Sequence, residues 1–293
     1  MEKSKVYFIK EISPESLIKI YEKLEKQLTG NIAVKISTGE PGGKNFLSPN
    51  LIKNLVQKLD GTIVECNTAY EGRRNTSEKH WEAIKEHGFL DIAKVDILDE
   101  YEDMIIPVTN GKHIKENIVG KNLEKYDSIL MLSHFKGHQM GGFGGALKNM
   151  SIGIASTRGK TWIHTAGKTN NPDIIWQNTA PQNEFLESMA EADESVVRYM
   201  NENIVYINVL NNISIDCDCN SNPEAPCMHN IAITASIDPV ACDQASLDLI
   251  YNSEDTGKER LIKRIENLNG IRIIEHAENL GIGSRNYELI NID

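Results

Sequence analysis

The stretch "SILMLSHFKGHQMGGFGGALKNM", Ser128–Met150, joins a short apolar run to a segment rich in glycine, histidine and lysine. The run "SILMLS" has the length and the apolar character of a buried strand. The glycine residues that follow allow the backbone to approach a ligand closely. A strand that leads into such a loop is typical of an α/β sheet that binds a ligand at the carboxyl ends of its strands.

The chain on both sides of this stretch alternates apolar strand-like runs with amphipathic helical ones. The sequence therefore predicts an α/β fold with a mostly parallel sheet flanked by helices. The pair Asn110–Gly111 lies between apolar runs and predicts a β-hairpin excursion near residues 104–119. We expect residues 1–293 to form a single domain, and a division into two α/β lobes near 120–127 is the alternative.

The composition limits the classes of function. The 293 residues carry a formal net charge of −11, which argues against a broad nucleic-acid surface because such surfaces need an excess of lysine and arginine. No apolar run approaches the roughly 18 residues of a membrane span, and the first residues do not resemble a signal peptide. We therefore expect a cytoplasmic protein that binds neither nucleic acid nor membrane, and whose five cysteines are thiols or metal ligands.

Polar, glycine-rich or cysteine-rich segments follow five of the predicted strands, whereas the segments after helices are plain. If the strands are parallel, these five loops meet at one edge of the sheet. They follow the strands 31–37, 61–66, 128–133, 203–212 and 231–236.

The opening stretch matches no complete motif for phosphate, dinucleotide or zinc-protease chemistry. Its glycines, Gly144 and Gly145 among them, can present backbone amides to an anion, and Lys148 can neutralise one. A helix that starts near Ala146 would favour an anion at its amino end. The alternative is a glycine-rich turn that only packs against a neighbouring strand.

The segment "CDCNSNPEAPCMH" offers several soft metal ligands. Cys217 and Cys219 share one face if the chain is extended, and Cys227 follows. With His134 and His138, they predict a site for an iron or zinc ion or an iron–sulfur cluster. Whether Cys227 and the nearby His229 are ligands stays open, and a surface loop of reduced cysteines is the alternative.

Basic and titratable residues elsewhere complete the candidate site. "TRGKTWIHTAGKT" (157–169) carries Lys160 as an anion ligand and His164 as a group for proton transfer, with a solvated basic loop as the alternative. Lys35 and Arg73 follow or end predicted strands and are further candidate anion ligands. Asp243, in the first turns of a predicted helix, is a candidate ligand or base.

Several motifs in order resemble the domain-of-unknown-function family numbered 362. They are "KGHQMGGFGGALKNMSIG", the residues Gly159, Lys160 and His164, "CDC" at Cys217–Cys219, and "ASIDPVACDQASLDLI". Members are often labelled iron–sulfur-centre proteins, and many relatives carry C-x-x-C-x-x-C runs, which this sequence lacks. The resemblance implies that Lys148, the Lys160/His164 segment and the helix start from Asp238 to Asp243 are shared features.

These observations favour a metal-dependent or redox-related enzyme acting on a small anionic molecule at the carboxyl-end edge of the sheet. In this interpretation His164, Lys148 and Asp243 are catalytic. A non-catalytic carrier of a metal or iron–sulfur cluster, which would serve a redox partner protein, is the first alternative. A metal-free phosphate- or nucleotide-binding protein is the second.

Overall fold

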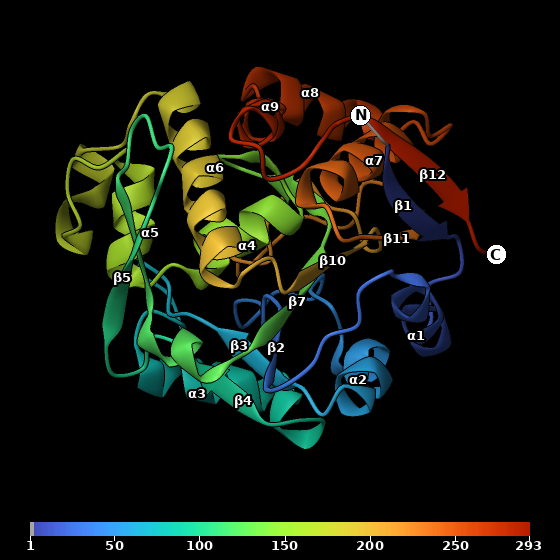
Figure 1. The fold of residues 1–293 in the computed structure, drawn as a ribbon, viewed down its shortest axis with the longest axis horizontal. Helices are drawn as coiled ribbons and strands as arrows, with labels where there is room; N and C mark the ends of the chain where they lie inside the picture. The colour runs from blue at the N-terminus through green and yellow to red at the C-terminus, as the bar shows by residue number, and fades with distance from the viewer. Residues whose placement is uncertain (1–2) are drawn as a thin grey trace.

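The computed structural model describes residues 3–293, in which helices cover both faces of an eight-stranded sheet (Figure 1). The strands lie in the order β12-β1-β11-β10-β7-β2-β3-β4. β11 is antiparallel to both of its neighbours, and all other pairings in this sheet are parallel. The predicted α/β fold with a mostly parallel sheet is confirmed. The strands are β1 (Ser4–Ile9), β2 (Ile32–Lys35), β3 (Thr62–Glu65), β4 (Val95–Ile97), β7 (Ser128–His134), β10 (Ile204–Val209), β11 (Ile233–Ser236) and β12 (Tyr287–Asn291).

The helices form two layers, one on each face of the sheet (Figure 1). One layer contains α1 (Pro14–Lys23), α2 (Pro49–Lys58) and α3 (Ser77–Glu86). The other contains α4 (Ala146–Ile154), α5 (Thr157–His164), α6 (Gln182–Tyr199), α7 (Pro239–Tyr251), α8 (Lys258–Asn267) and α9 (Arg272–Asn279). Three short 3-10 helices are η1 (Phe89–Asp91), η2 (Lys121–Lys125) and η3 (Pro172–Gln177). Across residues 3–293, none of the helices combines the length and apolarity that a membrane crossing requires.

Two small antiparallel hairpins lie outside the main sheet. β5 (Asp103–Pro107) pairs with β6 (Glu116–Gly120), which confirms the hairpin predicted near 104–119. β8 (Lys136–His138) pairs with β9 (Gly142–Gly144) inside the glycine-rich stretch. Strands from both sides of residues 120–127 are neighbours in the main sheet, because β2 pairs directly with β7.

The direction of β11 corrects one expectation about the loops. The segment 210–232 between β10 and β11 contains no helix, so the chain turns back and β11 pairs antiparallel with β10. The loop after β11 therefore lies at the opposite edge of the sheet from the other four loops. The prediction that all five loops share an edge is wrong for this one.

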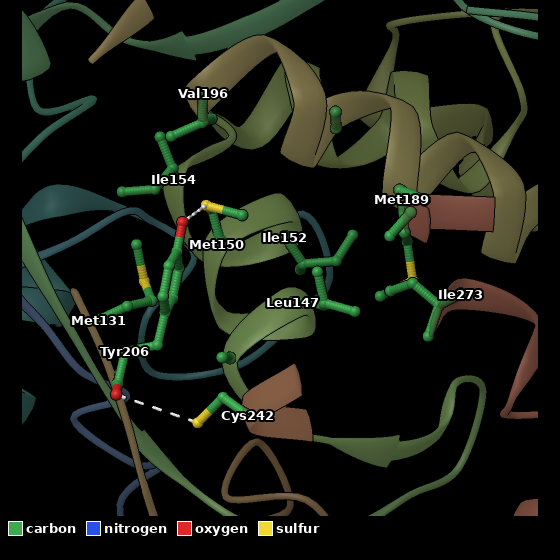
Figure 2. Close-up of a cluster of buried hydrophobic side chains, with 14 of the residues drawn as sticks. Met131, Leu147, Met150, Ile152, Ile154, Met189, Val196, Tyr206, Cys242 and Ile273 are labelled. Carbon is green, nitrogen blue, oxygen red and sulfur yellow. Dashed lines mark hydrogen bonds between the residues drawn. The ribbon is translucent and has the colours of Figure 1, made fainter. Parts of the chain in front are cut away.

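Helix α4 is held on the sheet by its apolar face. Leu147, Met150 and Ile154 belong to the buried cluster drawn in Figure 2. Tyr206 of β10 reaches into the same cluster and donates a hydrogen bond from its hydroxyl to the sulfur of Met150, at 3.8 Å. This packing leaves the opposite side of α4, with Lys148, to face the strand ends.

The amino end of α4 is capped by a carboxylate from another helix. Gly145 precedes α4 and supplies no side chain, so Asp243 of α7 accepts the backbone N–H groups of Ala146 at 2.7 Å and Leu147 at 3.0 Å. The side-chain amide of Asn208 donates to the same carboxylate at 2.7 Å. Burial raises the pKa of Asp243 to about 6, although these hydrogen bonds oppose the rise.

Residues 157–164 form α5 and not a solvated basic loop, which was the alternative offered by the sequence. Ser156 caps this helix by accepting the N–H of Gly159 at 3.2 Å. Thr161 and Ile163 are buried, so tertiary packing stabilises a segment whose threonine and glycine residues are weak helix formers. Lys160 and His164 consequently lie on consecutive turns of one helix.

Replacing Asp243 with alanine should destabilise the fold. The change leaves two backbone N–H groups of α4 and the amide of Asn208 without their acceptor, which we expect to cost about 1–3 kcal/mol. Urea denaturation followed by circular dichroism measures the free energy of unfolding. Glu254→Ala, at an exposed carboxylate after α7, is the matched control and should change it by less than about 0.5 kcal/mol. Equal stability of the two variants would show that the cap is unimportant.

Candidate active site

A cavity of about 230 Å³ lies at the carboxyl ends of β2, β3, β7 and β10. These four parallel strands deliver the loops that the sequence predicted to converge. α4, α5, η3 and α6 close the other sides of the cavity. Of the residues predicted from sequence, those that line it are Lys35, His134, His138, Gly144, Gly145, Lys148, Lys160, His164, Cys217 and Cys219.

The "CDC" segment after β10 is anchored through its central residue. The carboxylate of Asp218 lies 2.8 Å from Nδ1 of His134 and 2.8 Å from the ammonium of Lys136. All three side chains are buried. Asp218 thereby ties the loop after β10 to the end of β7, and the cysteines on either side of it line the cavity.

Cys217 is surrounded by groups that stabilise its thiolate. A hydrogen bond from the thiol of Cys219 is the largest of several effects that hold the pKa of Cys217 well below its usual range, against its burial. The ammonium of Lys148 lies 3.7 Å from its sulfur, and the backbone N–H of Cys219 lies 3.4 Å from it. The same hydrogen bond, together with burial, raises the pKa of Cys219 well above its usual range. These opposite shifts favour the thiolate on Cys217 and the thiol on Cys219.

His138 lies beside these two sulfurs, and its ring is oriented by the backbone. Its Nδ1 accepts the N–H groups of Met140 at 3.2 Å and Gly141 at 2.8 Å. Burial lowers the pKa of His138, so the ring is neutral and its proton resides on Nε2. The ligand atoms of His138, Cys217 and Cys219 all lie within 4.8 Å of one another. The arrangement supplies either a hydrogen-bond donor to the thiolate or three ligands to a metal ion.

Three lysines in the cavity are not paired with carboxylates. The ammonium of Lys35 contacts the side-chain oxygen of Asn149 at 3.0 Å, that of Lys160 contacts a backbone carbonyl at 2.6 Å, and that of Lys148 contacts Cys217. Within residues 3–293, no carboxylate lies within ion-pair distance of these three groups. Burial is the main cause that lowers the pKa of Lys35 to about 8; the charge of Glu65 opposes the fall, and the charges of the other two lysines add to it. A bound anion would relieve this repulsion.

His164 is arranged as a proton acceptor. Its Nδ1 donates to the carbonyl of Lys160 at 2.6 Å, which leaves the lone pair on Nε2. Burial lowers its pKa to about 4, so the ring is neutral at pH 7. The ring lies against Phe185, with 4.8 Å between the ring centroids.

Two predicted metal ligands do not join the group of three. Both ring nitrogens of His134 are engaged, Nδ1 with Asp218 and Nε2 with the carbonyl of Asn211 at 2.7 Å. His134 therefore holds the loop in place and has no free nitrogen for a metal. Cys227 donates its thiol hydrogen to the carbonyl of Ile213 at 3.4 Å and does not line the cavity.

Three further side chains named from the sequence also lie elsewhere. Arg73 forms an ion pair with Glu86 at 2.8 Å on the surface. His229 is exposed and pairs with Asp255, so it is not part of the group of three. Asp243 does not line the cavity, because its carboxylate caps α4.

The guanidinium that does line the cavity is that of Arg74, next in sequence to Arg73. It is buried and forms ion pairs with Glu40 and Glu65, each at 3.0 Å. The pair of arginines was visible in the sequence, but which of two adjacent residues faces inward depends on the path of the loop. The role of Asp218 was equally hidden, because an acidic residue between two cysteines resembles a metal ligand.

Comparisons with known proteins place the chain in a family. The solved structures that resemble it include the lactate racemase apoprotein from Thermoanaerobacterium thermosaccharolyticum (TM-score 0.47, 12% identity, covering 83% of this chain and 56% of that chain). They also include a structural-genomics protein from Thermotoga maritima (TM-score 0.39, 14% identity, covering 91% of this chain and 58% of that chain). The chain thus spans little more than half the length of either protein. No curated protein matches it. The family model described as domain of unknown function (DUF362) matches residues 32–248, most of the chain, so the protein belongs to the DUF362 family.

Proposed function

We propose that the protein is a thiolate-dependent enzyme that acts on a small organic anion bound in the cavity. The observation that carries the proposal is the meeting, in one cavity, of the sulfur of Cys217 with Lys35, Lys148 and Lys160. Each element alone has a structural explanation. Together they place a nucleophile beside uncompensated positive charge, which a bound anion would balance.

Each group in the cavity has a distinct role. Lys35 and Lys160 hold the anion, and Lys148 lies between the anion and the thiolate. Sγ of Cys217 is the nucleophile, and Nε2–H of His138 donates a hydrogen bond to it. Nε2 of His164 accepts a hydrogen bond from the bound molecule.

A metal-dependent form of the same enzyme is the second candidate. It is favoured by the spacing of His138, Cys217 and Cys219, since three protein ligands facing a cavity leave a position open for substrate, as catalytic zinc sites do. Two contacts oppose it. A metal ion would have to displace the Nε2 proton of His138, because Nδ1 already accepts two N–H groups, and Lys148 would repel the ion at short range.

A four-iron cluster does not fit the residues present. Such clusters are held by four cysteine thiolates, whereas three cysteines, Cys66, Cys217 and Cys219, line the cavity, and the thiol of Cys66 donates a hydrogen bond to the carbonyl of Ile154 at 3.3 Å. Cys227 lies outside the cavity, where its thiol donates a hydrogen bond to a backbone carbonyl. The proposed function therefore involves no iron–sulfur cluster. A carrier of such a cluster, which the sequence offered as an alternative, would lack the cysteine ligands it needs.

Cys217 should react with iodoacetamide almost as fast at pH 6 as at pH 8, because its thiolate is already formed at the lower pH. Mass spectrometry after peptide digestion measures the rate at each cysteine. Cys227, whose pKa is raised by burial, should react much more slowly at pH 6 and is the internal control. Lys148→Met should move the pH at which the reactivity of Cys217 begins to fall upward by about one unit, since removing a nearby positive charge raises the pKa of a thiol by about that amount.

The predicted thiolate is wrong if the alkylation rate of Cys217 depends on pH as that of an ordinary thiol does and rises steeply above pH 8. Elemental analysis of protein purified without oxygen separates the second candidate. Stoichiometric zinc or iron that is lost in Cys219→Ser, with Cys217 protected from alkylation until the metal is removed, would favour the metal-dependent form.

Anion binding should weaken as the pH rises through about 8, where Lys35 loses its proton. The charged lysine binds the anion, so affinity is constant below its pKa and falls above it, and the bound anion in turn raises that pKa. Isothermal titration with malonate from pH 7 to 9.5 measures the effect, because the charge of malonate is constant over this range. Lys35→Met should bind about tenfold more weakly at pH 7 and lose the pH dependence. Lys53→Met, at an exposed lysine of α2, should behave as the unchanged protein. A pH dependence that persists in Lys35→Met would assign the titration to another group.

A further inference from the structure

One side of the cavity is apolar, and the binding of an anion by the lysines gives this side no role. Ile152, Ile175, Trp176, Phe185 and Met189 all contribute to its lining. Most of them are buried, but Trp176 on η3 leaves 55% of its surface exposed. A large indole left in contact with water at a cavity is characteristic of a surface that a ligand covers.

Helix α5 relates the apolar side to the cations. Lys160 and His164 line the cavity from consecutive turns, so about 6 Å of helix axis separates them. The His164 ring is 4.8 Å from the ring of Phe185 and 6.4 Å from that of Trp176, measured between centroids. The cavity is therefore cationic at the Lys160 turn and aromatic at the His164 turn.

We propose that the ligand is an organic anion with an aromatic or bulky apolar substituent, its charge held by Lys35, Lys148 and Lys160 and its substituent packed against Trp176 and Phe185. The inference rests on the proposed anion site and narrows its substrate class. A separation of about one helical turn fits an apolar group attached within a few bonds of the charged group. An inorganic anion or a small dicarboxylate would leave the indole uncovered.

Trp176 is held where this contact requires it. Ile175, its neighbour on η3, is buried, and Asn171 caps η3 by accepting the N–H of Asp173 at 3.1 Å. Burying an apolar group of phenyl size against such a surface is expected to raise the affinity about tenfold or somewhat more.

The test compares three probes that differ in one feature each: malonate, phenylmalonate and the neutral phenylmalonamide. Isothermal titration should show phenylmalonate binding about tenfold more tightly than malonate, and phenylmalonamide binding far more weakly than phenylmalonate. Trp176→Ala should remove most of the advantage of phenylmalonate and leave the affinity for malonate within about twofold. Tyr101→Ala, at an aromatic residue that is 82% exposed and does not line the cavity, should leave both affinities unchanged.

The outcomes separate this inference from the function on which it rests. Equal affinity for malonate and phenylmalonate overturns the apolar subsite and leaves the anion site intact. Phenylmalonamide binding as tightly as phenylmalonate overturns the role of the lysines. Failure of all three probes to bind, in protein whose Cys217 shows thiolate reactivity, overturns the anion site and the inference together.

Discussion

The buried contact of Asp218 with His134 and Lys136 is the constraint on which the candidate site depends. It joins the loop after β10 to the end of β7, two neighbouring strands of the sheet. Burial would raise the pKa of Asp218, but the charges of His134 and Lys136 lower it to about 2. An ion pair buried this completely costs a large desolvation energy, and removing one partner leaves an unpaired charge that destabilises by about 3–5 kcal/mol. The loop has therefore little freedom to move its two cysteines away from the cavity.

The cations of the site fall into two groups, those that have a carboxylate partner and those that do not. Arg74 and Lys136 have carboxylate partners, Glu40 and Glu65 for the first and Asp218 for the second, and they act as part of the scaffold. Lys35 and Lys160 have only neutral oxygen partners. Buried cations without counter-charges are costly, so a fold keeps them where a ligand supplies the missing charge. This contrast, more than the number of lysines, points to an anion.

The sequence predicted the parts of this molecule that local patterns determine. Alternating apolar runs and helix caps specify the sheet and its helices. The hairpin lies where Asn110–Gly111 predicted it, but residues 108–115 join its strands in place of a two-residue turn. The direction of β11 depends on pairing across the sheet, and the helix of residues 157–164 depends on burial of Thr161 and Ile163, so neither is visible locally. The site residues also divide into those that local sequence predicts and those that depend on the tertiary structure. Lys148, Cys217 and Cys219 lie in the cavity because they follow strands, whereas choosing Arg74 over Arg73 requires the path of the loop.

Lys148 connects the two halves of the proposed chemistry. Its ammonium is 3.7 Å from the sulfur of Cys217 and is one of the charges that stabilise the thiolate. An anion that pairs with Lys148 would offset part of this positive charge. The pKa of Cys217 would therefore rise when the anion binds. A thiolate of higher pKa is the stronger nucleophile, provided that it remains ionised. The hydrogen bonds from Cys219 and His138 keep it ionised, because they do not involve the anion. Binding of the anion would thus make the thiolate more reactive without protonating it, which couples the occupancy of the cavity to the reactivity of its nucleophile.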